Sequence, residues 1–204
     1  MSFLGTKPKI DELKGKTFAI KDTIAVAGIK CTNGIDRKPS EWVPKVDATL
    51  VTRILDAGRI ILGKSACEAS YLVAVSDTSI TNNVHNPYKY GYSTGGSSSG
   101  SARLVATGMV DMAVGADQGG SIRKPSANCG VVGMKPTWEL VPYASCLRLE
   151  ATLGHAGPMA RNVEDCATLL LEAMILMIDN PMISLKDGSS LDRSFGDSLG
   201  SLRT

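Results

Sequence analysis

Apolar residues recur along this chain with the periods of both helices and strands. In residues 47–58, "DATLVTRILDAG", the helical period is carried by Leu50, Val51, Ile54 and Leu55. Gly58 stands just past this run, where a glycine commonly ends a helix. The next segment, "RIILGK", predicts a short buried strand over Ile60–Leu62. A helix followed directly by a strand indicates an α/β layer arrangement.

The same pattern predicts further elements on both sides of this unit. "KTFAIKDTIAVAG" predicts two short β runs, separated by the polar pair Lys21 and Asp22. "MVDMAVGAD" predicts a strand, and "CGVVGMKPT" predicts another short buried strand that Pro136 ends. Helices are expected over residues 102–109 and over "VEDCATLLLEAM", where Asn162 is a suitable N-cap residue.

Composition indicates one globular domain. The chain has 204 residues, of which 43% are hydrophobic and 21% charged, as in ordinary soluble proteins. We expect residues 1–180 to form the core and the polar, serine- and glycine-rich residues 181–204 to form a loosely ordered tail. No stretch reads as a secretory signal or a membrane span, which predicts a cytoplasmic protein. The net charge of +2 gives no reason to expect nucleic acid or a membrane surface as a partner.

The cysteines favour a reducing compartment and no metal. The chain has five, an odd number, and no pair has the CxxC spacing of zinc sites. Neither a disulfide framework nor a metal site is therefore expected, and the thiols are predicted to be free.

Two glycine-serine loops carry the candidate chemistry: "STGGSSSGSA", Ser93–Ala102, and "DQGGSIR", Asp117–Arg123. Either loop alone is typical of a surface turn. The first lacks the lysine of a P-loop and the spacing of a dinucleotide-binding loop, so nucleotide binding is disfavoured. It does fit GxSxG with Ser98 as nucleophile, for which His155 is the histidine that follows in the required order.

A lysine is the alternative base. Lys21 interrupts the apolar run "FAIKDTIAV", and a desolvated lysine can be neutral near physiological pH. An exposed lysine at a strand end, paired with Asp22, is the competing interpretation of this segment.

The run "GGSSSGSARLVATGMVDMAVGADQGGSIRKPSANCGVVGMKPT", Gly95–Thr137, resembles the signature region of the amidase signature family. "AIKDTIAVAG", "DATLVTRILDAGRIILGK" and "TNNVHNP" resemble other segments of that family, so the similarity runs from about residue 15 to about residue 175. It implies an α/β fold in which helices sandwich a mixed β-sheet. It also implies an amidase that hydrolyses a small-molecule amide through a serine acyl-enzyme, without cofactor or metal.

The resemblance assigns a role to each matching residue. Ser121 matches the nucleophile, Ser97 the second serine, which lies in an unusual cis peptide, and Lys21 the base. The oxyanion would be bound by backbone N–H groups of the turn before the nucleophile, which here contains Gln118, Gly119, Gly120 and Ser121. Three further residues are expected to support the site: Ser98, Asp117 and Arg123.

The chain is shorter than members of that family. We therefore expect an incomplete sheet with an exposed apolar edge, which would favour self-association. Much of the acyl-binding pocket would be missing, which predicts reduced or absent turnover. The alternative to an active amidase is an impaired remnant that serves as a binding or regulatory partner or has no function.

Overall fold

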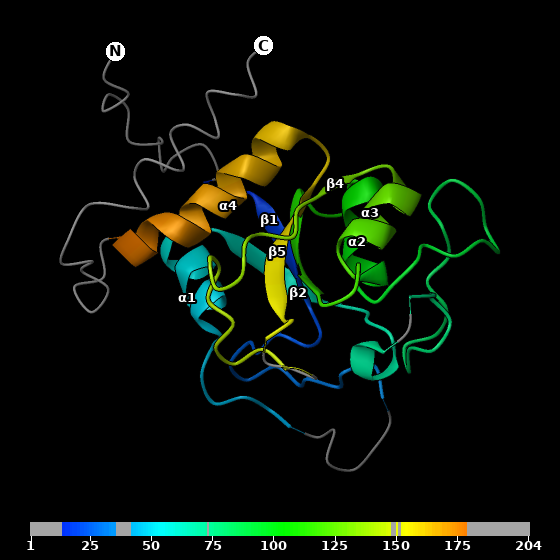
Figure 1. The fold of residues 1–204 in the computed structure, drawn as a ribbon, viewed down its shortest axis with the longest axis horizontal. Helices are drawn as coiled ribbons and strands as arrows, with labels where there is room; N and C mark the ends of the chain where they lie inside the picture. Colours follow the sequence, from blue (N-terminus) through cyan, green and yellow to red (C-terminus); the bar gives the residue numbers. More distant parts are fainter. Residues whose placement is uncertain (1–13, 36–41, 73, 148–149, 151, 179–204) are drawn as a thin grey trace.

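A mixed β-sheet forms the centre of the protein (Figure 1). The computed structural model describes residues 14–35, 42–72, 74–147, 150 and 152–178. Within them the strand order is β2-β1-β3-β5-β4. β1 pairs in parallel with both β2 and β3, whereas β5 pairs antiparallel with β3 and β4. The strands are β1 (Thr17–Lys21), β2 (Ile60–Ser65), β3 (Met112–Asp117), β4 (Val132–Gly133) and β5 (His155–Ala160).

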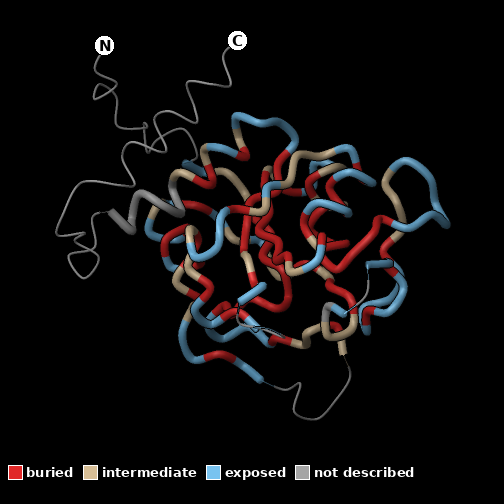
Figure 2. Tube along the Cα trace, viewed as in Figure 1, coloured by how far each residue is buried: buried red, intermediate tan, exposed pale blue. Residues whose placement is uncertain are grey.

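Helices cover both faces of this sheet. α1 (Thr49–Asp56) and α4 (Val163–Ile178) pack on one face, and α2 (Ser99–Ala106) and α3 (Arg123–Cys129) pack on the other (Figure 1). A short 3₁₀ turn, η3 (Ala69–Tyr71), follows β2. Buried positions concentrate in the sheet and on the inner sides of the helices (Figure 2). The predicted α/β sandwich with a mixed sheet is confirmed.

Local sequence explains where α1 and α4 begin and end. α1 buries Leu50, Val51 and Ile54, and Gly58 follows its end with a φ of +73°, a conformation that glycine adopts without steric cost. Asn162 caps α4, because its Oδ1 accepts a hydrogen bond of 2.7 Å from the Asp165 N–H. Both helix signals in the sequence are therefore confirmed.

β2 is a strand, as predicted, but the prediction that Ile60–Leu62 are buried is wrong. Ile60 is 49% exposed and Leu62 is 58% exposed. The reason is strand order: β2 lies at the edge of the sheet, and its side chains alternate between cover and solvent. The sheet thus has an edge strand that presents apolar side chains to solvent.

Four other elements differ from the prediction. The second β run, after Lys21, makes only single bridges, because the chain turns at once and the Ile24 N–H bonds the Lys21 carbonyl at 2.9 Å. β4 has only two residues, and both are half-buried. α2 ends before Met109, which is 66% exposed. β5 was not predicted.

None of the helices in the described part of the chain is long and apolar enough to cross a membrane. The predicted tail, residues 181–204, lies outside the described residues.

Candidate active site

Lys21 ends the central strand β1 and points into the protein. Its side chain is 1% exposed, so the interpretation as an exposed strand-end lysine is wrong. The ammonium donates hydrogen bonds to Ser97 Oγ at 2.8 Å and to the Ala116 carbonyl at 3.2 Å. Burial lowers the pKa of Lys21 to about 8, against the opposing effects of Cys67, Asp117 and Glu68. A useful fraction of this amine is therefore neutral near physiological pH.

The loop that carries Ser97 leads into α2 and is buried from Thr94 onward. The Gly96–Ser97 peptide bond is cis. The loop packs closely against the chain that leaves β2, where the Gly100 N–H donates to the Ala66 carbonyl at 3.1 Å. A Cβ on Gly100 would lie 2.5 Å from the Ala66 backbone nitrogen, so only glycine allows this approach.

The serines of this loop have separate partners. Ser97 bonds Lys21, whereas the Ser98 hydroxyl donates to the Ala116 carbonyl at 3.2 Å and accepts from the Ala116 N–H at 3.3 Å. Ser99 donates to Glu68 at 2.7 Å. Ser98 thus fastens the loop to β3.

Ser121 lies in the turn between β3 and α3 and is half-buried. Its carbonyl accepts a hydrogen bond of 3.2 Å from the Ser98 N–H, which joins the two glycine-serine loops. The structure therefore brings Lys21, Ser97 and the Ser121 turn together at one end of β1 and β3, although they are far apart in sequence.

Asp117 fixes the shape of this turn. Its carboxylate accepts hydrogen bonds from the N–H groups of Gly120 at 2.7 Å and Ile122 at 3.0 Å. It also accepts two from the Arg123 guanidinium, at 3.0 and 3.1 Å. Burial alone would raise the pKa of Asp117, but the hydrogen bonds from Arg123, Ile122 and Gly120 outweigh it and lower the pKa to about 2. The pairing of Asp117 with Arg123 is as expected.

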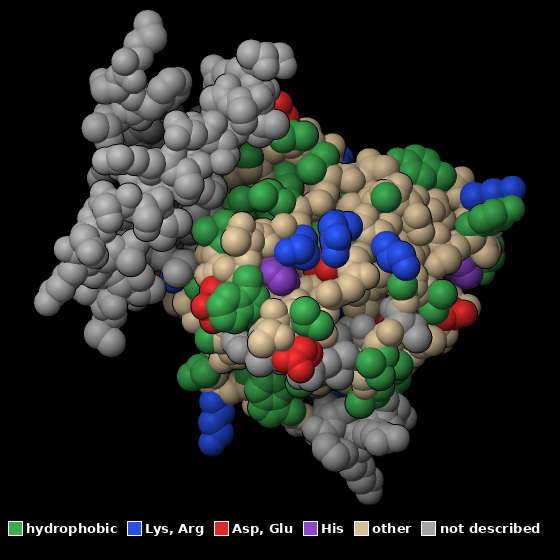
Figure 3. Space-filling model, in the orientation of Figure 1, with side chains coloured by type: hydrophobic (Ala, Val, Ile, Leu, Met, Phe, Trp, Pro, Cys, Tyr) green, Lys and Arg blue, Asp and Glu red, His purple; other side chains and the backbone are tan. Residues whose placement is uncertain are grey.

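The N–H groups of the turn are not equivalent. That of Gly120 is used by Asp117. Those of Gly119 and Ser121 have no hydrogen-bond partner among the described residues. The Gln118 side chain turns away and donates to the Glu150 carbonyl at 3.4 Å. Lys and Arg side chains gather nearby, over the region between β5 and α3 (Figure 3).

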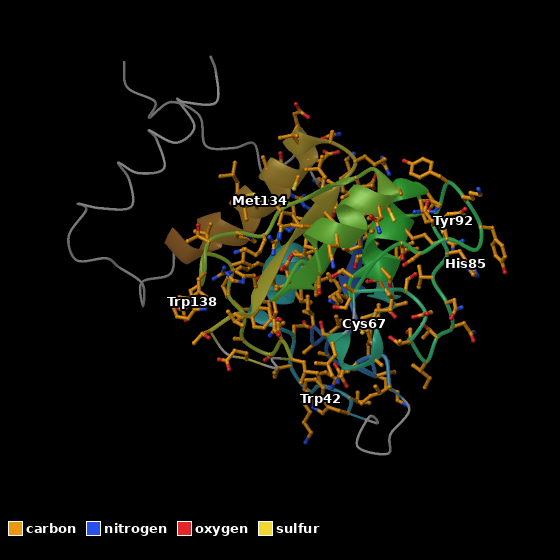
Figure 4. All side chains as sticks on the ribbon, turned by 45° about the vertical axis from the view of Figure 1, so that its right-hand side comes forward. Trp42, Cys67, His85, Tyr92, Met134 and Trp138 are labelled. Carbon is orange, nitrogen blue, oxygen red and sulfur yellow. The ribbon has the colours of Figure 1, made fainter. Side chains whose placement is uncertain are left out.

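The structure does not assemble the alternative Ser98–His155 pair. Ser98 bonds Ala116, and His155 Nδ1 lies 2.8 Å from the Leu153 carbonyl oxygen. His85 stacks on Tyr90, with 4.0 Å between the ring centroids. It projects from the loop before Ser93, well away from Cys67 (Figure 4). Among the described residues, no group of three or more His, Cys, Asp or Glu could hold a metal ion.

Two residues near Lys21 were missed by the sequence analysis. Cys67 and Glu68 directly follow β2, are completely buried and act electrostatically on Lys21. Burial raises the pKa of the Cys67 thiol to about 12. The available signal was Glu68 itself, an acidic residue among the small side chains of "SACEAS".

Comparisons with known proteins agree with this arrangement. The model of the family described as Amidase matches residues 5–191. The chain is 49% identical over 160 residues to an enantioselective amidase of Rhodococcus rhodochrous, covering 78% of this chain and 30% of that protein. It is 44% identical over 158 residues to a glutamyl-tRNA(Gln) amidotransferase subunit of Haloarcula marismortui, covering 78% and 37%.

Solved structures show the same similarity. The native peptide amidase from Stenotrophomonas maltophilia has a TM-score of 0.72 and 35% identity, covering 78% of this chain and 33% of that one. The corresponding glutamyl-tRNA(Gln) amidotransferase subunit from Thermotoga maritima has a TM-score of 0.73 and 34% identity, covering 78% and 36%. The chain thus spans about a third of the length of the relatives it matches.

Proposed function

The chain belongs to the Amidase family, and from this premise we propose that it carries the catalytic core of an amidohydrolase that cleaves a linear carboxylic amide to an acid and ammonia or an amine. The main support is the hydrogen bond of 2.8 Å between the buried amine of Lys21 and the Ser97 hydroxyl. A buried lysine with a pKa near 8, next to a serine, is the arrangement that a lysine base requires.

In the proposed mechanism, neutral Lys21 accepts a proton from Ser97, which takes one from the Ser121 hydroxyl as it attacks the amide carbonyl. The oxyanion is bound by N–H groups of the turn, for which Gly119 and Ser121 have donors unused by the described residues. The loss of one such donor typically raises the barrier by about 3 kcal/mol. The proton returns to the leaving amine, and water then cleaves the acyl-enzyme.

The proposed substrates are small aliphatic or aromatic amides. "GADQGGSIR" and "VPYASCLRLEATLGHAGPM" are more similar to free-standing amidases than to the transamidation enzymes. The higher identity to the enantioselective amidase, 49% against 44%, supports the same choice.

The proposal is tested by labelling the folded chain with a fluorophosphonate and locating the adduct by mass spectrometry. We expect the adduct on Ser121, its loss in Ser121→Ala, and strong reduction in Lys21→Met and Ser97→Ala. His155→Ala is the control and should label normally. An adduct on Ser98, or labelling that survives Ser121→Ala, would contradict the assignment.

Hydrolysis of propionamide and benzamide, measured by ammonia release, then distinguishes an active amidase from the alternative. Labelling at Ser121 without release of ammonia would favour an impaired remnant, an outcome consistent with a chain that spans only about a third of its relatives' length.

A further inference from the structure

Glu68 is a completely buried carboxylate beside the candidate site. One oxygen accepts a hydrogen bond of 2.7 Å from the Ser99 hydroxyl. The other accepts from the Thr78 N–H at 3.0 Å and from the Thr78 hydroxyl at 2.8 Å. Every partner can donate, which fits an ionised carboxylate, because that form can only accept.

The same residue holds the Ser97 loop at a second point. The Glu68 N–H donates to the Ser97 carbonyl at 3.4 Å, while its side chain binds Ser99. Glu68 therefore contacts the loop on both sides of Ser98, through backbone and side chain.

Three groups act electrostatically on Lys21: Cys67, Asp117 and Glu68. The Cys67 thiol is neutral at physiological pH, because burial raises its pKa to about 12. The Asp117 carboxylate is paired with Arg123. Within the described residues, Glu68 forms no ion pair with any lysine or arginine within 4 Å, so its charge is left to act on Lys21.

We propose that Glu68 is a positioning residue of this site: its carboxylate holds the Ser97 loop against the end of β2 and supplies the buried negative charge that balances the Lys21 ammonium. This inference rests on the proposed function for its catalytic meaning, but the protonation of Lys21 can be measured without any turnover.

Glu68→Gln separates the charge from the shape. The Thr78 N–H can only donate, so the amide oxygen must face Thr78. The amide nitrogen then faces the Ser99 hydroxyl, which can accept as well as donate. Ser99→Ala is the matched control, because it removes a hydrogen bond to Glu68 and keeps the charge.

The experiment follows Lys21 by NMR in chain labelled with ¹³Cε-lysine, with its signal assigned through Lys21→Met. Removal of the negative charge disfavours the ammonium, so we expect Glu68→Gln to lower the titration midpoint by about half a unit, less than the 1–3 units of a directly contacting charge. Ser99→Ala should leave the midpoint unchanged. An unchanged midpoint in Glu68→Gln, or an equal shift in both variants, would overturn the proposal.

A double-mutant cycle covers the case in which Glu68→Gln is too unstable to titrate. Urea midpoints are measured for Glu68→Gln, Lys21→Met and the double variant. The proposal requires Glu68→Gln to be better tolerated when Lys21 is already replaced, whereas additive effects would refute it. A normal shift of Lys21 in a chain that fails to label at Ser121 would count against the proposed function alone.

Discussion

Asp117 is expected to make a pH-dependent contribution to the stability of the protein. Its pKa is about 2 in the folded chain, against an ordinary value of 3.8. At 1.36 kcal/mol per unit, this difference corresponds to about 2 kcal/mol of unfolding free energy. Because the folded pKa is depressed, the contribution is complete well above pH 4 and is lost as the pH falls through about 2; roughly half should be gone at pH 3.

Asp117→Asn removes this contribution. The asparagine also turns an NH₂ group toward N–H donors that Asp117 now accepts, which leaves a buried donor unsatisfied at a cost of about 1–3 kcal/mol. At neutral pH we expect a total loss of about 3 kcal/mol.

Urea unfolding at a series of pH values from 7 to 3 measures this effect, with the exposed Asp77→Asn as control. The difference in unfolding free energy between wild type and Asp117→Asn should shrink by about 1 kcal/mol as the pH falls to 3. A difference that stays constant with pH would refute the argument, since it would show that the charge of Asp117 contributes nothing.

Three further outcomes are expected. Gly100→Ala should lower the unfolding free energy by about 1–3 kcal/mol in urea titrations, because its Cβ would overlap the Ala66 backbone; a gain of about 1 kcal/mol, as helix propensity favours, would contradict this. Gly119→Ala is its control, since a Cβ there meets no atom within 4 Å. Asn162→Ala should cost about 1 kcal/mol in the same assay through loss of the α4 cap, and no change would contradict the capping role. Fluorophosphonate labelling should accelerate with pH through a midpoint near 8, as Lys21 becomes neutral, and a rate independent of pH from 6 to 9 would contradict its role as base.

Elements with strong local signals could be predicted from the sequence. The period of α1, the cap of α4 and the apolar run of β3 each depend on residues close together in the chain. β5 could not, because Gly157 and Pro158 disfavour a strand, yet pairing with β3 over six residues holds them extended. Strand order is also invisible locally, which is why β2 was expected to be buried.

The candidate site divides in the same way. The resemblance of the two glycine-serine loops to a known family assigned Ser97, Ser121 and Lys21, and the structure brings their segments together. The burial of Lys21 could not be decided from its own segment, because the loop that covers it lies 76 residues away. Glu68 was missed for the same reason: its partners Ser99 and Thr78 lie 31 and 10 residues further along the chain.

The buried cysteines make this chain its own reporter of motion. All five thiols are free and buried, and burial raises the pKa values of Cys31, Cys67, Cys129 and Cys166. A thiol of this kind reacts with an alkylating reagent only when the chain around it opens. Alkylation followed by peptide mass spectrometry would therefore time the opening of separate parts of the molecule, with Cys67 recording the surroundings of Lys21 and Cys166 recording α4.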